Sequence, residues 1–276
     1  EVITMKLKEK IHQSYFELTP AEKKVADHFL WAGADIIYET MNDIKEKTKV
    51  GDATIVRLCH KLGYSGFSDL KVEVAKEDYS SNVEQTGKSP YASIENALTK
   101  TIKTTLSELN QGALAKAVAA LGKAKRIYIL GVGGSALSSK ALESMLLRIG
   151  VRAQAVTDPH YQAQLAAITD SSDLFIVFSL TGRTKDTLEP LKIAKKNQAQ
   201  VIAITTYPAS PIALEADIVL QTAVDDFLNG GSLIGRMSQL LVADVLVYEY
   251  EKLNSADTIN AREKVVRAIL NKRKME

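Results

Sequence analysis

Apolar positions in residues 1–78 recur at helical spacing, and no stretch there alternates as a strand would. Residues 19–22 read Thr-Pro-Ala-Glu, which combines an N-cap threonine, a proline at the first helical position and a glutamate at the third. This capping box predicts a helix start, and the apolar stripe behind it is formed by Val25, Ala26, Phe29 and Leu30. The first part of the chain is therefore expected to be helical.

Two further helices are predicted on either side of a tight turn. Thr40 is expected to cap the first of them, with Asp43 at its positive end, and residues 49–52 break it. Gly63 is expected to end the second as the C′ glycine. The second helix runs from about residue 52 to 62, and its inward positions are Ile55, Leu58 and Leu62. A helix, a short turn containing glycine and a further helix form a helix-turn-helix.

The rest of the chain alternates short apolar runs with amphipathic stretches, as a β-α-β-α protein does. The strands are expected at residues 126–130, 152–157, 173–179, 200–206 and 218–222. Because these runs are apolar on both faces, they indicate a buried parallel sheet with helices on each side. The predicted fold class is an all-α helix-turn-helix domain followed by an α/β three-layer sandwich with a five-stranded parallel sheet.

Composition refines this picture. A chain of 276 residues with 46% hydrophobic and 25% charged residues is expected to form two globular domains. The expected boundaries are 1–78 for the helix-turn-helix domain, 79–90 for a polar linker, 91–255 for the sandwich with leading helices, and 256–276 for a C-terminal helix and tail. The single cysteine, Cys59, indicates a reducing compartment, and no apolar run approaches the ~20 residues of a membrane span. A cytoplasmic protein without a membrane partner is expected.

The second helix of the pair carries the first chemical signal. Its outward positions are Thr54, Arg57, His60 and Lys61, and Lys49 in the turn would lie near phosphates. Arg57 can bind a guanine edge bidentately. The net charge of the whole chain is only +2, and that of residues 1–79 is −2, yet residues 45–61 carry +3. These features favour double-stranded DNA as a partner, and an ordinary solvated helix pair is the alternative.

Two loops at strand ends carry the second signal. Residues 131–135 (Gly-Val-Gly-Gly-Ser) and 179–184 (Ser-Leu-Thr-Gly-Arg-Thr) each lead into a helix. Glycines let the backbone approach an anion, and a helix N-terminus directs free N–H groups at it. The candidate binding residues are Gly133, Ser135, Ser179, Thr181, Gly182 and Thr184. Hydroxyl and amide donors without an added metal suit a phosphate monoester, so no metal and no cofactor are expected.

Two other interpretations of the first loop stay open. Gly131, Gly133 and Ala136 satisfy G-x-G-x-x-A, and Asp158 follows 22 residues later, as in dinucleotide-binding proteins. The hydroxyl-rich second loop is not needed by a nicotinamide site, which weakens this alternative. The second interpretation is that both loops are only tight turns with capping Ser and Thr.

The residues of both loops and of the helix pair carry a family resemblance. Residues 179–184 after a strand, with Gly133 and Ser135 upstream, resemble the phosphosugar-binding SIS (sugar isomerase) domain. Residues 19–26 and 53–67 resemble the helix-turn-helix domain of RpiR-type regulators. The resemblance covers residues from about 5 to 250. It implies a bacterial transcriptional regulator whose SIS domain senses a sugar phosphate and alters operator binding.

The resemblance adds site residues. It implies that Asp158 and His160 contact the effector, although His160 can equally be a solvent-facing residue at a helix start, and it adds Tyr64 to the expected DNA-binding residues. Two positions depart from the family pattern. Gly51 replaces the usual serine before the recognition helix, so Asp52 is expected to cap it. Thr181 replaces the commoner serine in the second loop.

The chain is expected to be a regulator and not an enzyme. An SIS-type isomerase needs a base, generally a glutamate in a late helix, but the helix expected at 233–253 has no glutamate before Glu249. Asp244 in that helix is as plausible as a structural hydrogen-bond acceptor. A homodimer or a dimer of dimers is expected to form through this helix and the stripe Ile94, Leu98, Ile102 and Leu106, with a buried core helix as the alternative. The sugar, the operator and the sign of regulation are not encoded in any of these motifs.

Overall fold

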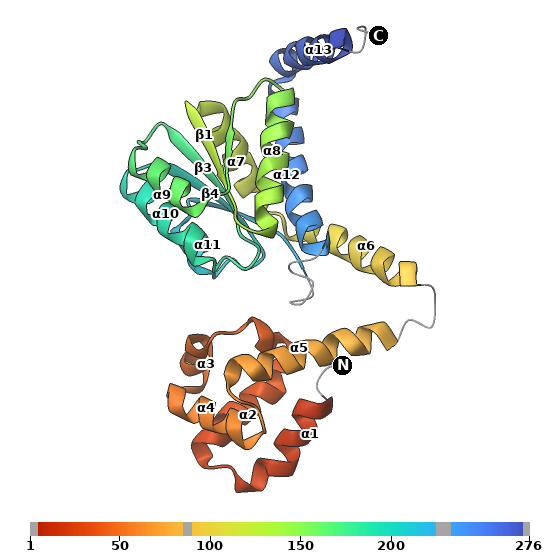
Figure 1. The fold of residues 1–276 in the computed structure, drawn as a ribbon, viewed down its shortest axis with the longest axis vertical. Coiled ribbons are helices and arrows are strands. Elements are labelled where there is room, and N and C mark those ends of the chain that lie inside the picture. The colour runs from red at the N-terminus through yellow and green to blue at the C-terminus, as the bar shows by residue number, and fades with distance from the viewer. Residues whose placement is uncertain (1–4, 85–89, 225–232, 273–276) are drawn as a thin grey trace. The chain divides into compact units, whose positions relative to one another are not determined.

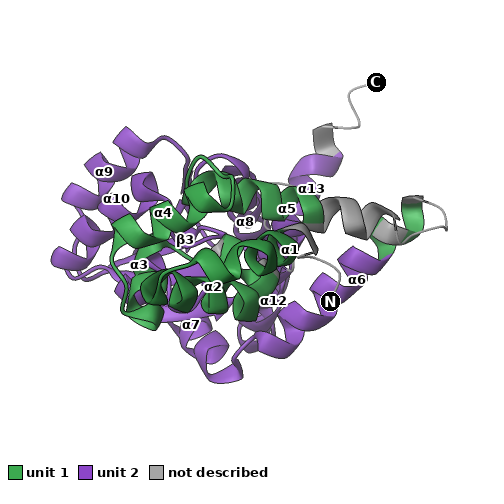
Figure 2. Ribbon diagram, turned by 90° about the horizontal axis from the view of Figure 1, so that it is seen from below, with its two compact units in different colours: residues 1–95 green, residues 96–276 purple. Residues whose placement is uncertain are grey.

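The protein divides into two units, residues 1–95 and residues 96–276 (Figure 2). The structure is a computed structural model that describes residues 5–84, 90–224 and 233–272. Each unit has its own buried core, as the composition predicts for two domains. Among the described residues, no helix has the length and apolar character needed to cross a membrane.

The described residues of the first unit form helices joined by short turns, with no strand among them (Figure 1). Its helices are α1 (Met5–Ser14), α2 (Pro20–Ala32), α3 (Met41–Thr48), α4 (Asp52–Lys61) and α5 (Phe67–Glu84), and Tyr15–Glu17 and Gly33–Tyr38 form 3-10 turns. The predicted inward positions of α2 and α4 are confirmed, because Val25, Phe29, Ile55 and Leu58 are completely buried in one cluster. Helices α3 and α4 form the predicted helix-turn-helix.

The two predicted helix starts are confirmed as capping boxes. The N–H of Thr19 donates to the Glu22 carboxylate at 2.8 Å, and the N–H of Glu22 donates back to the Thr19 hydroxyl. Thr40 and Asp43 repeat the arrangement at the start of α3. Each box provides acceptors for N–H groups that the first turn of a helix leaves without a partner.

The end of α4 is also as predicted. Gly63 lies at φ +84°, a conformation that side chains disfavour, and its N–H donates to the carbonyl of His60. The N–H of Tyr64 donates to the carbonyl of Cys59 at 2.9 Å. These two bonds make a Schellman motif.

The predicted capping by Asp52 is wrong. Gly51 has the extended backbone of an N-cap residue (φ −76°, ψ 159°), and no side chain caps α4. Asp52 is already the first helical residue, so its side chain is not placed to accept from the N–H groups of the following turn. Its carboxylate instead accepts a hydrogen bond from Lys45 at 3.3 Å.

The predicted linker begins too early. Helix α5 continues to Glu84 instead of ending before residue 79, and α6 (Pro90–Glu108) begins at Pro90. The polar residues after 78 can stay helical because a helix tolerates Ser and Asn at a modest cost of about 0.5 kcal/mol each. Residues 85–89 lie outside the described residues.

The second unit is a three-layer α/β sandwich (Figure 1). Its strands are β1 (Arg126–Leu130), β2 (Gln154–Val156), β3 (Asp173–Phe178), β4 (Gln200–Thr205) and β5 (Ile218–Gln221). Its helices after α6 are α7 (Gln111–Lys123), α8 (Gly134–Arg148), α9 (Pro159–Ala167), α10 (Lys185–Lys196), α11 (Pro211–Glu215), α12 (Leu233–Leu253) and α13 (Ser255–Lys272). Within the described residues the strands form one parallel sheet, so the predicted fold class is confirmed.

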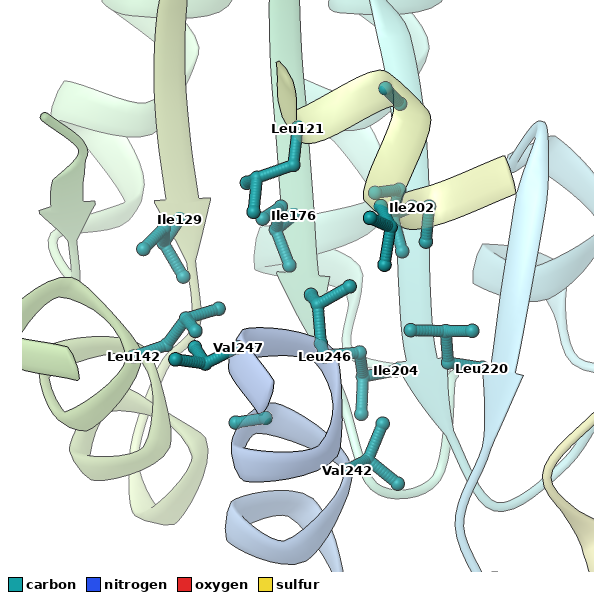
Figure 3. Close-up of a cluster of buried hydrophobic side chains, with 14 of the residues drawn as sticks. Leu121, Ile129, Leu142, Ile176, Ile202, Ile204, Leu220, Val242, Leu246 and Val247 are labelled. Atoms are coloured by element: carbon teal, nitrogen blue, oxygen red, sulfur yellow. The ribbon is translucent and has the colours of Figure 1, made fainter. Parts of the chain in front are cut away.

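The strand order is β2-β1-β3-β4-β5. Helices α7, α8 and α12 cover one face of the sheet, and α9, α10 and α11 cover the other (Figure 1). The first face is held by Ile129, Ile176, Ile202, Leu142 and Leu246, among others (Figure 3). The chain leaves β1 through α8 on one face and returns to β3 through α9 on the other. The carboxyl ends of β1 and β3 therefore flank the topological switch point, where open α/β sheets bind ligands.

Candidate functional site

The outward side of α4 carries four of the predicted DNA-binding residues, Thr54, Arg57, His60 and Lys61. Arg57 and His60 are exposed and Thr54 is half-buried. The Arg57 guanidinium donates to the Thr54 hydroxyl at 3.0 Å, and the His60 ring bonds the carbonyl of Ser65 at 3.0 Å. Lys49 is exposed at the C-cap of α3, where its backbone is left-handed (φ 56°, ψ 35°).

Three of the cations in the 45–61 window have carboxylate partners. Lys45 pairs with Asp52 at 3.3 Å, Lys47 with Glu39 at 2.5 Å and Lys61 with Glu22 at 2.8 Å. Among the described residues, the remaining cations Lys49 and Arg57 have no carboxylate partner within ion-pair distance. The positive charge available to a phosphate backbone is therefore concentrated at the turn and at the exposed face of α4.

Lys61 belongs to the fold as much as to the surface. Its partner Glu22 is buried in α2 and also accepts from Thr19. Burial raises the pKa of Glu22, but the hydrogen bonds from Lys61 and Thr19 outweigh it and hold that pKa below its ordinary value. The Lys61–Glu22 pair therefore ties α4 to α2.

Tyr64 lies in the core and not on the surface. It is 4% exposed, its ring faces the Lys10 ammonium at 4.0 Å, and burial raises its pKa to about 12. A buried ring cannot contact DNA without unpacking the domain, so the structure does not place Tyr64 with the other predicted DNA-binding residues.

In the second unit, the loop after β1 turns directly into α8. Gly133 is the N-cap residue at φ +56°, and Ser135 follows as the second residue of the helix, partly exposed. A Cβ at Gly131 would lie 2.4 Å from the Ser139 hydroxyl. The loop therefore packs tightly onto the first turns of α8, and the N-terminus of α8 faces the switch point.

The loop after β3 places two of the predicted hydroxyls in contact. The Ser179 hydroxyl lies 3.2 Å from the Thr184 hydroxyl. Thr184 is the N-cap residue of α10, but its side chain accepts no capping hydrogen bond. Thr181 is exposed, and its hydroxyl accepts from the N–H of Arg183 at 3.4 Å.

Gly182 fixes the path of the second loop. It is buried at φ +63°, and a Cβ there would lie 1.9 Å from the Ser210 hydroxyl. Its carbonyl accepts from the N–H of Ile212 at 3.0 Å. Glycine is required because the backbone passes directly over the start of α11.

Asp158 and His160 lie after β2, at the start of α9. The Asp158 carboxylate caps this helix and accepts from the N–H of Tyr161 at 2.8 Å. His160 is exposed on the first turn of α9. Because a carboxylate at this position also serves as a helix cap, its spacing from the first loop is not by itself evidence for a ribose contact.

Helix α12 contributes two residues that the sequence motifs did not place at the site. Gln239 is 1% exposed, and its amide donates to the Ser135 hydroxyl at 3.0 Å. An Arg236 guanidinium nitrogen lies 3.8 Å from the position that a Cβ of Gly134 would occupy, at the N-terminus of α8. Their signal in the sequence is a polar pair three residues apart in the first half of this helix.

The site is rich in donors. The segments 131–135 and 179–184 hold hydroxyls, backbone N–H groups and no carboxylate, and the positive ends of α8 and α10 start there. Among the described residues, no three His, Cys, Asp or Glu side chains are grouped to hold a metal ion. Later in α12, Asp244 is exposed and Glu249 pairs with Lys252 at 3.3 Å. Such a site suits a small anion.

Comparison with known proteins assigns both units. The model of the helix-turn-helix domain of the rpiR family matches residues 5–81, and the SIS domain model matches residues 120–248. An uncharacterized HTH-type transcriptional regulator of Haemophilus influenzae is 31% identical over 280 residues, covering 96% of each chain. The chain therefore belongs to the rpiR family of helix-turn-helix transcriptional regulators, with a SIS domain as its second unit.

Two further proteins are similar over most of the chain. The HTH-type transcriptional regulator RpiR of Escherichia coli is 32% identical over 248 residues, covering 86% of this chain and 83% of that protein. The solved structure of the Vibrio vulnificus NanR protein complexed with ManNAc-6P has a TM-score of 0.76 and 25% identity, covering 96% of this chain and 98% of NanR. The predicted family is confirmed.

Proposed function

We propose that this regulator binds an operator through α3 and α4, and that a sugar phosphate bound in its SIS domain changes its operator affinity. The observation that carries the proposal is that two hydroxyl-bearing loops follow the carboxyl ends of the adjacent strands β1 and β3, at the switch point of the sheet. Ser135 lies after β1, and Ser179 and Thr184 are in contact after β3. The presence of ManNAc-6P in the similar NanR structure supports a ligand of this class.

The proposed phosphate site uses donors only. The backbone N–H of Gly133 and the hydroxyls of Ser135, Ser179, Thr181 and Thr184 can donate to phosphate oxygens. The N–H of Gly182 already donates to the Ser179 carbonyl at 3.1 Å, so Gly182 is proposed to shape the loop. Arg236 lies at the same helix N-terminus and supplies a positive charge. Asp158 and His160, at the neighbouring strand end, are proposed to face the sugar.

The proposed DNA-binding residues are Lys49, Thr54, Arg57 and His60. Arg57 is exposed near the middle of α4 and suits a base edge, whereas Lys49 in the turn suits a phosphate. Lys61 is proposed to position α4 through Glu22. A bacterial regulator must reach its operator in the compartment that holds the chromosome, so we propose that this protein acts in the cytoplasm.

We infer a dimer, because helix-turn-helix proteins usually read two half-sites. Ile94, Ile102 and Leu106 of α6 are 53%, 37% and 45% exposed, which supports the predicted stripe as an interface. The late helix α12 behaves differently. Its residues Val242, Leu246 and Val247 lie in the core of their own domain (Figure 3). This supports the alternative interpretation, in which α12 is a buried core helix and not part of the interface.

We also propose that the SIS domain performs no catalysis. Ketose–aldose isomerisation needs a base near the sugar carbons, and the acidic side chains of α12 are not suited to it. Asp244 is exposed, Glu249 is paired with Lys252, and Glu251 is paired with Arg262. Incubation with fructose 6-phosphate, followed by NMR, is expected to show no aldose signal. Turnover at enzyme-like rates would overturn this proposal.

A thermal-shift screen tests the effector site. Hexose, pentose, amino-sugar and N-acetyl sugar phosphates are compared with the unphosphorylated sugars and with NAD. Stabilisation is expected from at least one sugar phosphate and from none of the free sugars, and it should be lost in the double variant Ser179→Ala with Thr184→Ala, because both hydroxyls lie at the phosphate site. Retained stabilisation in that variant would place the phosphate elsewhere, and stabilisation by NAD alone would favour the dinucleotide interpretation.

A gel-shift titration then tests the link to DNA. The sugar phosphate found in the screen is expected to change the operator affinity of the wild-type chain and to leave that of the double variant unchanged. A ligand shifts operator binding only if it prefers one of the two states of the protein. Equal operator affinity with and without the bound sugar phosphate would contradict the sensing role.

A further inference from the structure

Helix α12 reaches the proposed effector site through one buried polar side chain. Gln239 is 1% exposed, and it lies on α12 between Val242 and Gly235, which are also buried. Its amide contacts two hydroxyls of α8, those of Ser135 and Ser138. A buried amide costs stability unless its hydrogen bonds are satisfied, and these two contacts give each end of the Gln239 amide a partner.

The two contacts have opposite polarity. Gln239 Oε1 accepts from the Ser138 hydroxyl at 2.9 Å, and Gln239 Nε2 donates to the Ser135 hydroxyl oxygen at 3.0 Å. Ser138 is completely buried, so the carbonyl end of the amide provides its hydroxyl proton with an acceptor. The amide nitrogen then faces Ser135 and can only donate.

This polarity decides what Ser135 offers to a ligand. Because the Ser135 oxygen already accepts from Gln239, its hydroxyl proton is free to point outward to another acceptor. Ser135 is partly exposed at the N-terminus of α8, at the switch point of the sheet. A phosphate dianion presents acceptors only, so a serine held as a donor matches it without reorientation.

We propose that Gln239 is a positioning residue for the effector: with Ser138 behind it, Gln239 orients the Ser135 hydroxyl as a hydrogen-bond donor to the phosphate group. This inference rests on the proposed sugar-phosphate site and extends it to α12. Hydrogen bonds in a chain polarise one another, so the series from Ser138 through Gln239 to Ser135 also strengthens the donor at its exposed end.

The test is a double-mutant cycle on effector affinity, measured by calorimetry with the full chain. The probe is ManNAc-6P, or the sugar phosphate that gives the largest thermal shift. Gln239→Leu removes both contacts, and Gln239→Glu replaces the donor by a second acceptor that turns the Ser135 hydroxyl inward. We expect Gln239→Leu to weaken binding about tenfold and Gln239→Glu to weaken it more.

The coupling distinguishes positioning from a structural role. In the Ser135→Ala background, Gln239→Leu should change the affinity less than about twofold, because the hydroxyl that it orients is absent. Ser179→Ala serves as the matched control, since Ser179 lies in the other loop and should leave the full effect of Gln239→Leu intact. An equal effect of Gln239→Leu with and without the Ser135 hydroxyl would overturn the proposal.

Folding is monitored by thermal unfolding without ligand. If Gln239→Leu does not fold, Gln239→Glu and Ser138→Ala carry the same cycle, because both keep a polar or small side chain in place. Wild-type affinity in Gln239→Glu would overturn the proposal. If the wild-type chain binds no sugar phosphate, the proposed function itself fails; binding that depends on Ser135 and Ser179 but not on Gln239 rejects this inference alone.

Discussion

Two basic side chains on the surface of the helix-turn-helix have different roles. Lys61 and Arg57 both lie on α4, but Lys61 is bound to the buried Glu22, whereas Arg57 contacts only the neighbouring Thr54 hydroxyl among the partners described. The outward position that a helical wheel assigns to both side chains is correct. A helical wheel of α4 cannot show that Lys61 pairs with the carboxylate of Glu22, because Glu22 lies on α2, 39 residues away in the sequence.

Arg57→Ala is expected to weaken specific operator binding by about 1–3 kcal/mol, because a bidentate contact to a base edge is lost. A gel-shift titration on operator and on unrelated DNA measures the difference. Lys24→Ala, an exposed lysine on α2, is the matched control for a change of one charge. An unchanged titration would remove Arg57 from the proposed DNA-binding residues.

The pH dependence of stability tests the Lys61–Glu22 pair. The folded-state pKa of Glu22 is lowered, so its contribution is complete above the unfolded value of about 4.3 and is lost as the pH falls through the lower folded value. Glu22→Gln should cost about 1–3 kcal/mol in free energy of unfolding near neutral pH. In urea denaturation the gap in free energy of unfolding between wild type and variant should narrow as the pH falls below the unfolded value of about 4.3.

A gap that stays constant over that pH range would show that the charge of Glu22 contributes nothing. The variant Lys61→Met, measured in the same way, separates the two roles of the lysine. A loss of stability with unchanged operator affinity in the surviving folded protein would confirm Lys61 as a residue of the fold.

At the scale of elements, the local signals were reliable where they depend on neighbours in the chain. The capping boxes at Thr19 and Thr40, the C′ glycine at 63 and the five strands all appear where they were expected. The boundary at residue 79 was wrong, because polar composition alone does not distinguish a linker from the polar end of a helix such as α5. The predicted cap of α4 was also wrong, because an N-cap residue must have an extended backbone. Gly51 has that conformation, and Asp52 is already helical.

Gly182→Ala tests the second loop as an element. A Cβ there would lie 1.9 Å from the Ser210 hydroxyl, at a φ that alanine disfavours. The loop must therefore move, and this displaces the hydroxyls of Ser179 and Thr184 from their positions at the proposed phosphate site. We expect loss of the sugar-phosphate thermal shift together with a lower melting temperature. Retained stabilisation by the sugar phosphate would contradict this role of the loop.

Gly122→Ala is the matched control for that substitution. Its Cβ would meet the Tyr250 ring at an ordinary 3.7 Å, and it lies in helix α7. Alanine in place of a helical glycine should stabilise the domain by about 0.5–1 kcal/mol. The effector response should be unchanged.

At the scale of the whole molecule, the proposed dimer is tested on α6. The double substitution Ile102→Glu with Leu106→Glu places charges on the exposed stripe and is expected to give a monomer at micromolar concentration, measured by light scattering. Leu214→Glu, on the exposed face of α11, is the control. A monomeric wild-type chain, or a double variant that remains a dimer, would contradict an interface on α6.

The monomeric double variant should also have a lower operator affinity than the wild-type dimer. Two half-sites are bound together only when the two reading helices are linked, and a monomer loses that advantage of effective concentration. The same gel-shift titration that tests Arg57 measures this loss. The double variant should keep its response to the sugar phosphate in the thermal-shift assay, since its own effector site is intact.

The sequence by itself determined the helix-turn-helix, the order of strands and helices, and the two glycine- and hydroxyl-rich loops, because each depends on residues close together in the chain. Only the tertiary structure decided which polar side chains meet. Gln239 reaches Ser135 across 104 residues, Lys61 reaches Glu22 across 39, and Tyr64 is enclosed in the core. Such contacts arise from the packing of whole helices against one another, and no local pattern encodes the partner that the packing supplies.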